Sequence, residues 1–253
     1  MNKEDVIKNK NEAIKMMTDY LNNCLEIDDS TNIKKVNLIS YWLRDYIKYI
    51  KDEKNFNPIN LKTYVRGDII KVNLGFNIGS ELGGLHYCVV IDKKNNRNSP
   101  VVTVIPLSSQ KTDKINKNSI ILGNDIYNKL VEKSNKLLED NKIEIKENKN
   151  KLLIEIKRLT ENNATTDEIY LKTNELKNNI AEAYKKLKLA EKINAEVQKM
   201  KYGSIAIINQ IRVISKQRIY DPKTEFDILS GIKLSDENLD LIDFKMKKMF
   251  IKV

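Results

Sequence analysis

The chain has a single histidine, His86, at the end of a stretch that holds most of its glycines. A histidine has an unperturbed pKa of about 6.5, so one imidazole can both accept and donate a proton near neutral pH. Five of the eight glycines lie between Gly67 and Gly84, where they permit positive φ and close approach of the backbone to a ligand. These features predict proton-transfer chemistry beside a glycine-rich loop. The alternative interpretation is an ordinary strand histidine that follows a plain hairpin turn.

Composition narrows the class of protein that can carry such a site. Lys and Arg outnumber Asp and Glu by 45 to 35, and the net charge of +10 favours a polyanionic partner, either a nucleic acid or an acidic protein. The longest apolar runs, such as residues 88–91, are too short to cross a membrane, and residues 1–15 lack the apolar core of a secretion signal. Cys24 and Cys88 have no second Cys or His at metal-ligand spacing. We therefore expect a reduced, cytoplasmic protein without a disulfide framework, a metal site or membrane contact.

Short β-branched runs separated by turn residues predict a set of β-strands. The run HYCVVID at residues 86–92 is typical of a buried strand, and NNRNSP at residues 95–100 is a turn that leads into the next strand. The predicted strands are residues 68–75, 86–92, 101–107, 119–122, 204–209 and 212–215.

Apolar residues spaced by three and four predict helices at both ends of the chain. Residues 1–60 form an N-terminal helical region, in which residues 28–30 separate two helices and Pro58 ends the second. The apolar positions are Ile14, Met17, Leu21 and Cys24 in the first helix, and Ile39, Trp42, Leu43, Tyr46, Ile47 and Ile50 on one buried face of the second. A C-terminal helix is predicted over residues 236–251, with Ser235 as its N-cap.

Residues 124–201 predict a long helical hairpin, since no Gly or Pro occurs in them. Apolar residues recur every seven positions in two series, which is the pattern of a coiled-coil seam. The first series is Val131, Leu138, Ile145, Leu152 and Leu159, and the second is Ile169, Leu176, Ala183, Ala190 and Val197. Between the two series, Thr165 and Glu168 form a capping-box pattern that starts the second helix. We expect two antiparallel arms of about 35 residues, each roughly 50 Å long.

Three ordered blocks of sequence resemble one known family. The first contains Arg-Gly-Asp at residues 66–68, Gly-Ser-Glu-Leu-Gly-Gly at 79–84 and Val-Val-Ile at 89–91. The second contains Ser-Pro at 99–100 and Leu-Ser-Ser-Gln at 107–110, and the third is GSIAIINQIRVISKQRI at 203–219. These blocks resemble the MazF/PemK toxins of type II toxin–antitoxin systems, which have an RGD start, a GSEQGG-like loop and a GxVxxxQIRTIDKxRL element. The likeness covers residues 66–122 and 202–253.

This resemblance implies an α+β fold: an SH3-like small β-barrel of the MazF/PemK/CcdB kind, formed by residues 61–123 and 202–253 around the inserted hairpin. It also implies a homodimer and an endoribonuclease that cuts single-stranded RNA without a metal ion or cofactor. In that reaction a ribose 2′-hydroxyl attacks the adjacent phosphate and leaves a 2′,3′-cyclic phosphate and a free 5′-hydroxyl. A base must take the 2′ proton, a donor must stabilise the phosphorane, and an acid must protonate the leaving oxygen.

Aligned without gaps from Arg66, the sequence departs from this family at the catalytic position. His86 stands where the family has its catalytic Arg, and Tyr87 stands where it has the following Pro. Ser108 occupies the position of the catalytic Thr and keeps the hydroxyl, while Glu81 holds the acidic position of the loop. Because imidazole supplies proton transfer where guanidinium supplies a fixed positive fork, we expect His86 to act as the acid or the base. The candidates for an assisting cation are Lys93, Lys94 and Arg97.

Other residues of these blocks are candidates for RNA contacts, since amides and hydroxyls bond to splayed bases and aromatic rings stack on them. The candidate RNA-binding residues are Asn77, Gly79, Ser80, Gly83, Gly84, Lys93, Gln110 and Gln210, and the candidate stacking residues are Phe76, Tyr87 and Tyr202. Lys216 and Arg218 are interpreted as phosphate contacts or plain surface charge. Structural roles stay open for Glu81 and Ser108, and Asp68 is expected to bond local amides.

Three functions fit these features. The first is a sequence-selective mRNA interferase, neutralised by a cognate antitoxin that lies across the RNA site and that binds operator DNA together with the toxin. The second is a non-catalytic barrel that binds nucleic acid or regulates its own operon, with the coiled coil as an interaction platform. The third is a phage-defence effector, in which the helices sense a trigger and the barrel cuts RNA. The hairpin itself is either a structural element or a surface for RNA, an antitoxin or another partner.

Overall fold

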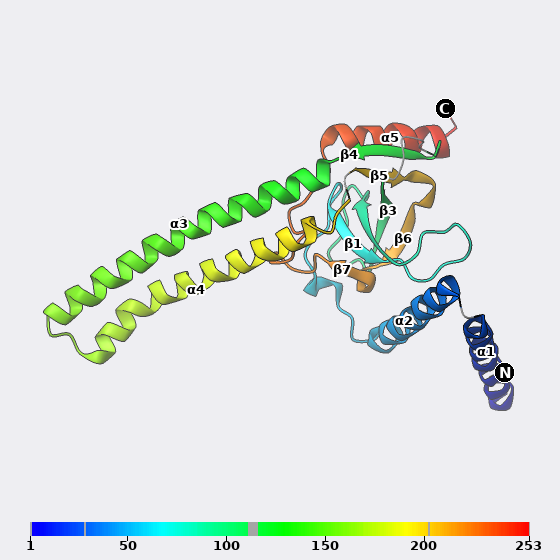
Figure 1. The fold of residues 1–253 in the computed structure, drawn as a ribbon, viewed down its shortest axis with the longest axis horizontal. Helices are drawn as coiled ribbons and strands as arrows, with labels where there is room; N and C mark the ends of the chain where they lie inside the picture. Colours follow the sequence, from blue (N-terminus) through cyan, green and yellow to red (C-terminus); the bar gives the residue numbers. More distant parts are fainter. Residues whose placement is uncertain (1, 28, 111–115, 202, 253) are drawn as a thin grey trace. The chain divides into compact units, whose positions relative to one another are not determined.

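A computed structural model describes residues 2–27, 29–110, 116–201 and 203–252 as an α+β protein (Figure 1). The helices are α1 (Lys3–Glu26), α2 (Ser30–Asp52), α3 (Asp125–Glu161), α4 (Thr166–Val197) and α5 (Asp236–Phe250). The strands are β1 (Ile69–Asn73), β2 (Leu85–Val90), β3 (Val101–Ser109), β4 (Ser119–Gly123), β5 (Ser204–Ile207), β6 (Arg212–Ser215) and β7 (Ile219–Asp221).

The chain divides into two compact units. One, here called the helical unit, comprises Met1–Phe56 and Asn73–Leu85; the other, the sheet unit, comprises Asn57–Val72 and His86–Val253. The glycine-rich loop therefore belongs with α1 and α2, and the inserted hairpin belongs with the sheet. The division of the chain at residues 60, 123 and 201 stays a prediction.

The seven strands form an antiparallel sheet in the order β4-β5-β3-β2-β1-β7, with β6 also paired to β3. β3 is the central strand, because its first half pairs with β6, from Val101 opposite Ser215 to Val104 opposite Arg212, and its second half pairs with β5. Among the described strands, no ladder joins β4 to β7. The expectation of a closed barrel is therefore corrected to an open sheet. Along one edge of its central strand, β3, the partner changes from β6 to β5.

All six predicted strands are present, and their ends differ from the prediction by at most two residues. The largest change of type follows β5, where Ile208–Gln210 forms a 3-10 helix instead of the end of a strand. The sequence prediction missed β7, because the three residues Ile219–Asp221 are too few to show alternation. Its pairing with β1, through Lys71 opposite Asp221, depends on residues far apart in the sequence.

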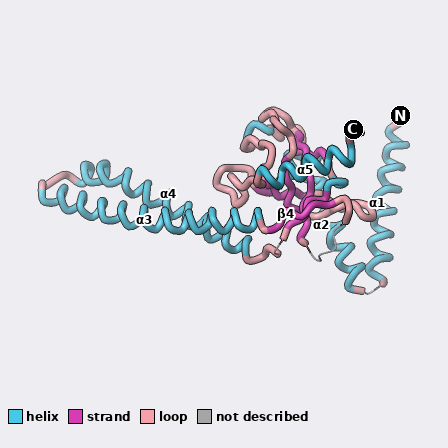
Figure 2. The backbone as a smooth tube through the Cα atoms, turned by 90° about the horizontal axis from the view of Figure 1, so that it is seen from above, coloured by secondary structure: helices cyan, strands magenta, loops and turns pink. Residues whose placement is uncertain are grey.

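The insertion is an antiparallel pair of long helices, which lie side by side in two views (Figures 1 and 2). α3 has 37 residues and α4 has 32, close to the predicted arms. The predicted capping box is confirmed, since the Thr165 hydroxyl accepts from the Glu168 amide at 3.3 Å and the Glu168 carboxylate accepts from the Thr165 amide at 2.9 Å. Every residue of the two predicted seam series is buried or half-buried. Coiled-coil geometry as such stays a prediction.

The base of the hairpin shares a hydrophobic core with the sheet. Ile126 and Leu130 of α3 and Ile193 of α4 are buried against strand residues such as Ile105, and Ile242 of α5 joins the same cluster. The predicted cap of α5 is confirmed, since the Ser235 hydroxyl accepts from the Asn238 amide at 3.4 Å.

Polar contacts also fix this base. The ammonium of Lys133 in α3 donates to three backbone carbonyls of one loop, at 2.7 Å from Ser230, 3.0 Å from Ile228 and 3.4 Å from Asp227. Burial lowers the pKa of Lys133, against the attraction of Asp221. The insertion is thus continuous with the sheet unit in both apolar and polar contacts.

In the helical unit the two predicted helices are present, and Asp29 caps α2 by accepting from the Thr31 and Asn32 amides. Ile39 is buried, as predicted, and Cys24 of α1 is buried too. The prediction of one buried face is wrong for the second half of α2, where the exposed side chains are Tyr46 at 49%, Ile47 at 50% and Ile50 at 52%. A pair of helices and one loop supply too few neighbours to cover every apolar side chain.

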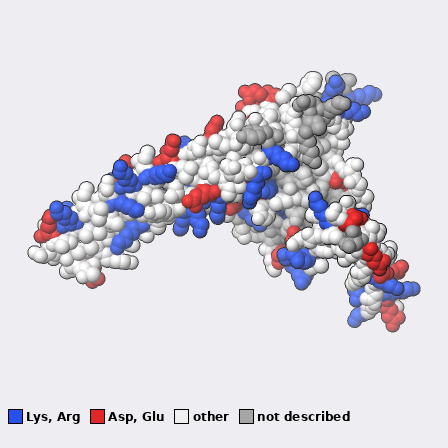
Figure 3. Space-filling view, in the orientation of Figure 1, with Lys and Arg blue, Asp and Glu red and all other residues white. Residues whose placement is uncertain are grey.

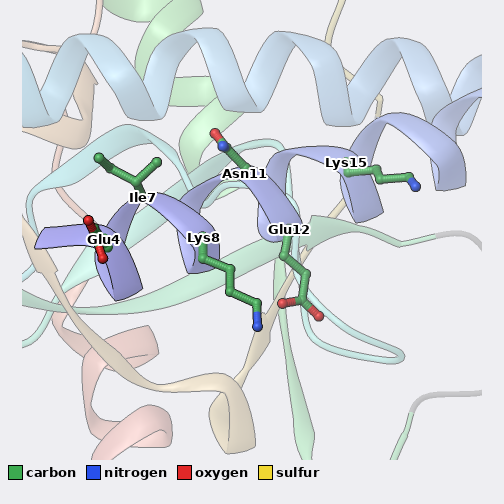
Figure 4. A pocket seen from close by; sticks show the side chains of 6 residues that line it. All are labelled: Glu4, Ile7, Lys8, Asn11, Glu12 and Lys15. Atoms are coloured by element: carbon green, nitrogen blue, oxygen red, sulfur yellow. The ribbon is translucent and has the colours of Figure 1, made fainter. Parts of the chain in front are cut away.

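A shallow hollow on α1 shows how open this unit is (Figure 4). It is lined by Glu4, Ile7, Lys8, Asn11, Glu12 and Lys15, all from one helix. Ile7 and Asn11 point away from Lys8 and Glu12, so the hollow is the side of a helix and not a cleft between elements.

None of the described helices has the length and apolar character needed to span a membrane.

Candidate active site

The register of β2 and β3, extended two residues past the Cys88–Pro106 pair, sets the two predicted catalytic residues opposite each other. The antiparallel ladder pairs Cys88 with Pro106 and Val90 with Val104. Continued by two residues, the same register sets His86 opposite Ser108. Side chains opposite each other in antiparallel strands point to one face, with Cβ atoms about 4.5–5.5 Å apart. The sheet therefore favours a single site that contains both residues.

The imidazole of His86 is oriented by the backbone of β3. Its Nδ1 lies 3.0 Å from the Leu107 carbonyl oxygen, and the residue is half-buried. A carbonyl oxygen can only accept, so Nδ1 carries the proton in this contact and Nε2 of the neutral ring has the available lone pair. This tautomer makes Nε2 the nitrogen that can take a proton from a substrate.

Arg212 lies on the same face of the sheet as His86 and Ser108. It is opposite Val104 in the β3–β6 ladder, and Val104 is in turn opposite Val90 of β2. Since side chains alternate along a strand, His86 and Val90 share this face. The face is buried at Val90 and Val104 and becomes accessible at His86 and Ser108, which are half-buried.

Cys88 lies between His86 and Val90 on this face, and the pKa of its thiol is affected by two arginines. Burial raises its pKa to about 12, and Arg212 and Arg218 act in the opposite direction. Both guanidinium groups are therefore near enough to Cys88 to act on it electrostatically. The sequence analysis did not single out Arg212. The sequence feature that could have identified Arg212 is its position in the third block that resembles the toxin family, residues 203–219.

Gln210 and Gln110 lie near opposite ends of β5. The Gln210 side-chain oxygen accepts from Arg212 Nη2 at 2.6 Å, and its backbone carbonyl accepts from Arg212 Nε at 3.2 Å, so Gln210 orients the guanidinium. The Gln110 amide donates to the Gly203 carbonyl at 3.0 Å. A Cβ on Gly203 would lie 2.9 Å from the Gln110 side-chain oxygen, so a larger residue there would displace this candidate RNA contact.

Tyr87 connects β2 to the inserted hairpin. Its hydroxyl donates to the carboxylate of Glu196 in α4, which also accepts from the ammonium of Lys71. Lys71 lies over the Tyr87 ring, 5.1 Å from its centroid. Burial and the bond to Glu196 raise the pKa of Tyr87; burial also acts to raise the pKa of Glu196, but the bonds from Lys71 and Tyr87 outweigh it and lower that pKa. These contacts favour a structural role for Tyr87 over base stacking.

The glycine-rich loop between β1 and β2 is closed by its own backbone. The Leu74 amide donates to the Gly84 carbonyl at 2.7 Å, and the Gly84 amide donates to the Gly75 carbonyl at 2.6 Å. A Cβ on Gly83 would lie 2.6 Å from the same Gly75 oxygen. Glycine at position 83 is therefore required by the close approach of two backbone segments.

Asn77 closes this loop from within. Its side-chain nitrogen donates to the Leu74 carbonyl at 3.1 Å and to the Leu82 carbonyl at 2.6 Å. In this conformation the amide nitrogen of Asn77 is thus engaged in shaping the loop. The other candidates here, Phe76, Gly79, Ser80 and Glu81, are exposed, and Tyr202 lies outside the described residues. Glu81 belongs to the helical unit and His86 to the sheet unit, and a catalytic role for Glu81 stays a prediction.

The three predicted cations are not brought to His86 by the strand. His86 is near the start of β2, whereas Lys93, Lys94 and Arg97 follow its far end, in the loop to β3. Arg97 Nε donates to the Ile59 carbonyl at 3.0 Å. Arg212 is level with Val90 at the same end of β2, but it extends from a strand on the face of His86 and acts electrostatically on Cys88, which favours it over these three loop residues as the assisting cation. An RNA contact at Lys93 stays a prediction.

Two polar residues have structural contacts. Lys216 is 1% exposed, and its ammonium donates to the Asn96 carbonyl at 3.0 Å, so its interpretation as a phosphate contact or surface charge is wrong. The role expected for Asp68 is confirmed, since its carboxylate accepts from the Val65 amide at 3.0 Å.

Within the ranges that the structure describes, no group of three or more His, Cys, Asp or Glu side chains is arranged to hold a metal ion.

Comparison with known proteins gives one family. Residues 65–149 match the model of the PemK-like, MazF-like toxin of type II toxin–antitoxin systems. The matched segment runs from before β1 to the middle of α3, about a third of the chain, and does not include the third aligned block. No curated protein sequence matches the chain. The family resemblance predicted from the sequence is therefore confirmed over residues 65–149, where the chain carries a PemK-like, MazF-like toxin domain.

Proposed function

We propose that the chain is the toxin of a type II toxin–antitoxin pair and that it cleaves single-stranded RNA without a metal ion. The ribose 2′-hydroxyl attacks the adjacent phosphorus, the bond from phosphorus to the 5′ oxygen breaks, and the products carry a 2′,3′-cyclic phosphate and a 5′-hydroxyl. The family match over residues 65–149 supports the toxin assignment. The register that sets His86 opposite Ser108 supports the site.

The hydrogen bond of His86 to Leu107 is the observation that carries the catalytic assignment. With Nδ1 bonded to the carbonyl, Nε2 is the base that takes the 2′ proton. The imidazolium that forms keeps its carbonyl acceptor, which stabilises the positive charge next to the crowded phosphate. The Ser108 hydroxyl, on the facing strand, donates to a non-bridging oxygen of the phosphorane.

Arg212 supplies the fixed positive charge that the family obtains from the Arg at the position of His86. Gln210 accepts two hydrogen bonds from its guanidinium, and the register sets Arg212 on the face that His86 and Ser108 share. A planar fork of donors matches the oxygens of a phosphate, and one such donor contributes about 10²–10³ in kcat in comparable sites. The chain thus divides the base and the stabiliser of the phosphorane between an imidazole and a guanidinium, and the leaving 5′ oxygen takes its proton from water.

The distribution of charge supports an RNA substrate. Residues 61–123 contain nine Lys and Arg against four Asp and Glu, and residues 202–253 contain nine against seven, so these segments carry +7 of the net +10. Residues 1–60 are neutral, with ten of each sign. Along the hairpin, Lys and Arg are interspersed with Asp and Glu (Figure 3). Positive charge concentrated on the sheet-forming segments favours phosphate binding there through counterion release.

The oligomeric state and the partners that we propose are those that the resemblance to the toxin family implies. The toxin is a homodimer, an antitoxin lies across the RNA site, and the pair binds operator DNA. The arms of the inserted hairpin pack as a coiled coil. The buried and half-buried seam residues of α3 and α4 support this last point.

The test is cleavage of a long single-stranded RNA by the purified full chain in EDTA, followed by detection of the 2′,3′-cyclic phosphate. We expect His86→Ala to abolish cleavage and Ser108→Ala to reduce it by about 10²-fold, whereas Ser108→Thr retains it. The matched control is Ser109→Ala, because Ser109 is the next residue of β3 and faces the opposite side. Intact RNA with the wild-type chain refutes the catalytic assignment and favours a nucleic-acid-binding role.

A further inference from the structure

The glycine-rich loop packs on α2 within the helical unit. Gly75 lies against the indole of Trp42, the only tryptophan of the chain, and a Cβ on Gly75 would be 2.8 Å from the nearest ring atom. The φ of Gly75 is +84°, in the region that favours glycine. The absence of a side chain is therefore what lets the start of the loop rest on this ring.

Hydrogen bonds fix the same contact. The Asn73 side-chain nitrogen donates to the Asp45 carboxylate at 3.1 Å, and its oxygen accepts from the Gly75 amide at 3.0 Å. Asn73 thereby joins α2 to the first turn of the loop with both ends of its amide. The bond to Asp45 is charge-assisted, which makes it stronger than a bond between neutral groups.

Gly75 in turn contacts the other end of the loop, at Gly83 and Gly84. The Gly75 carbonyl accepts from the Gly84 amide at 2.6 Å, and Gly83 is held against the same oxygen by the lack of a side chain. Gly83 and Gly84 are two of the candidate RNA-binding residues. Any shift of Gly75 on α2 therefore displaces the part of the loop expected to meet RNA.

We propose that α2 is a positioning element for this loop, in which Trp42 and Asp45 hold Gly75 and Asn73 so that the loop keeps the shape that receives single-stranded RNA. The inference rests on the proposed function, because it requires an RNA-binding loop. Trp42 and Asp45 touch neither substrate nor reacting atoms and are positioning residues. The N-terminal helices, which the family match does not cover, thus set the affinity for RNA and leave the chemical step unchanged.

The first experiment exchanges the two partners of the charge-assisted bond. Asn73→Asp sets a second carboxylate against Asp45, and we expect KM for RNA to rise about tenfold, with kcat within about twofold of the wild type. Adding Asp45→Asn restores a donor–acceptor pair with the roles reversed, and we expect KM to return to within about threefold. The control is Asp52→Asn, an exposed position of the same helix.

Two results would overturn the proposal in that experiment. One is an Asn73→Asp variant with the wild-type KM. The other is a double variant that keeps the defect of the single one, because the effect would then not run through the pair.

The second experiment uses Trp42 as a fluorescent reporter and needs no cleavage. The probe is a mixed-sequence 2′-O-methyl RNA of about 20 nucleotides, which lacks the attacking hydroxyl; we expect it to change the Trp42 emission of the wild type on binding. Gly75→Ala should alter the emission without RNA, because the new Cβ meets the indole. The matched control is Gly231→Ala in the sheet unit, because Gly231 also has a positive φ, +75°, and no atom lies within 4 Å of a Cβ built on it, so the emission should stay that of the wild type.

The two experiments separate the inference from the proposed function. A wild-type chain that binds the analogue with a change in Trp42 emission but leaves ordinary RNA intact supports the inference and refutes the cleavage. A chain that cleaves RNA, yet whose Trp42 emission is the same in Gly75→Ala and Gly231→Ala and unaffected by the analogue, refutes the inference alone.

Discussion

Replacing Glu196 by glutamine removes the charge that ties the inserted hairpin to the strand of His86. The carboxylate accepts from Lys71 and Tyr87, and the side chains of Lys71 and Glu196 are only 20% and 16% exposed. Breaking a fully buried ion pair costs about 3–5 kcal/mol. The residual exposure of this pair lowers that figure, and the new amide oxygen keeps one acceptor, so we expect Glu196→Gln to lower the free energy of unfolding by about 1–2 kcal/mol near neutral pH.

The effect of this substitution has a defined pH dependence. Burial acts to raise the pKa of Glu196, but the bonds from Lys71 and Tyr87 outweigh it and hold the pKa below its ordinary value of 4.5. A carboxylate with a lower pKa in the folded chain stabilises the fold above its unfolded pKa, and this contribution is lost as the pH falls through the folded value. The difference between wild type and Glu196→Gln is therefore largest near neutral pH and shrinks below pH 4.5.

Urea unfolding followed by circular dichroism measures this difference near neutral pH and at about pH 3.5. The matched control is Glu191→Gln, an exposed glutamate of the same helix, which should unfold as the wild type does. A double-mutant cycle with Tyr87→Phe isolates the coupling of Glu196 to β2. The reasoning is refuted if Glu196→Gln has the wild-type midpoint, or if its destabilisation is equally large at the acid pH.

A thiol, a helix cap and the imidazole give three further tests. Since burial raises the pKa of Cys88 to about 12, iodoacetamide should alkylate it only after unfolding; rapid labelling of native Cys88 in mass spectrometry contradicts this. Asp125→Ala removes an acceptor 2.7 Å from the Ser235 amide and 3.1 Å from the Asn238 side chain, which should destabilise the start of α5 by about 1–2 kcal/mol and speed its hydrogen exchange. Unchanged hydrogen exchange in α5 contradicts the expected role of Asp125 at the start of this helix. His86→Arg restores a cation but not a neutral base, so cleavage should persist at a much lower rate than in the wild type. A variant that cleaves as fast as the wild type excludes His86 as the base.

The helical hairpin was predictable because each of its signals lies in a short window of sequence. Thr165 and Glu168 are three residues apart, and they form the capping box that starts α4. The seam repeats every seven residues, so its burial follows from one helix packing along another. Strand positions were predictable for a similar reason, since β-branched runs and turn residues are local.

The pairings between distant residues were not predictable from such signals. Trp42 and Gly75 belong to separate patterns, an amphipathic helix and a glycine-rich loop, and neither pattern specifies the other as its partner. Arg212 reaches the face of His86 only because β6 and β2 flank the same strand β3, which is a property of the ladder order. The exposure of Tyr46 follows from how little of the chain packs on α2, and periodicity alone does not report that.

The place of the insertion explains how both halves of the candidate site are attached to it. Gly123 and Ser204 are paired neighbours in the sheet, and the Gly203 amide donates to the Asn124 side chain at 2.8 Å, so the hairpin begins and ends at adjacent points and can extend without separating β4 from β5. Through β5, which pairs with β3, the neck of the hairpin is joined by two consecutive ladders to the strand that carries Ser108. Through Glu196, α4 is bonded to the residue that follows His86. The hairpin is therefore attached to both catalytic strands, to one by backbone pairing and to the other by a single carboxylate, and only the second attachment can be removed without disturbing the sheet.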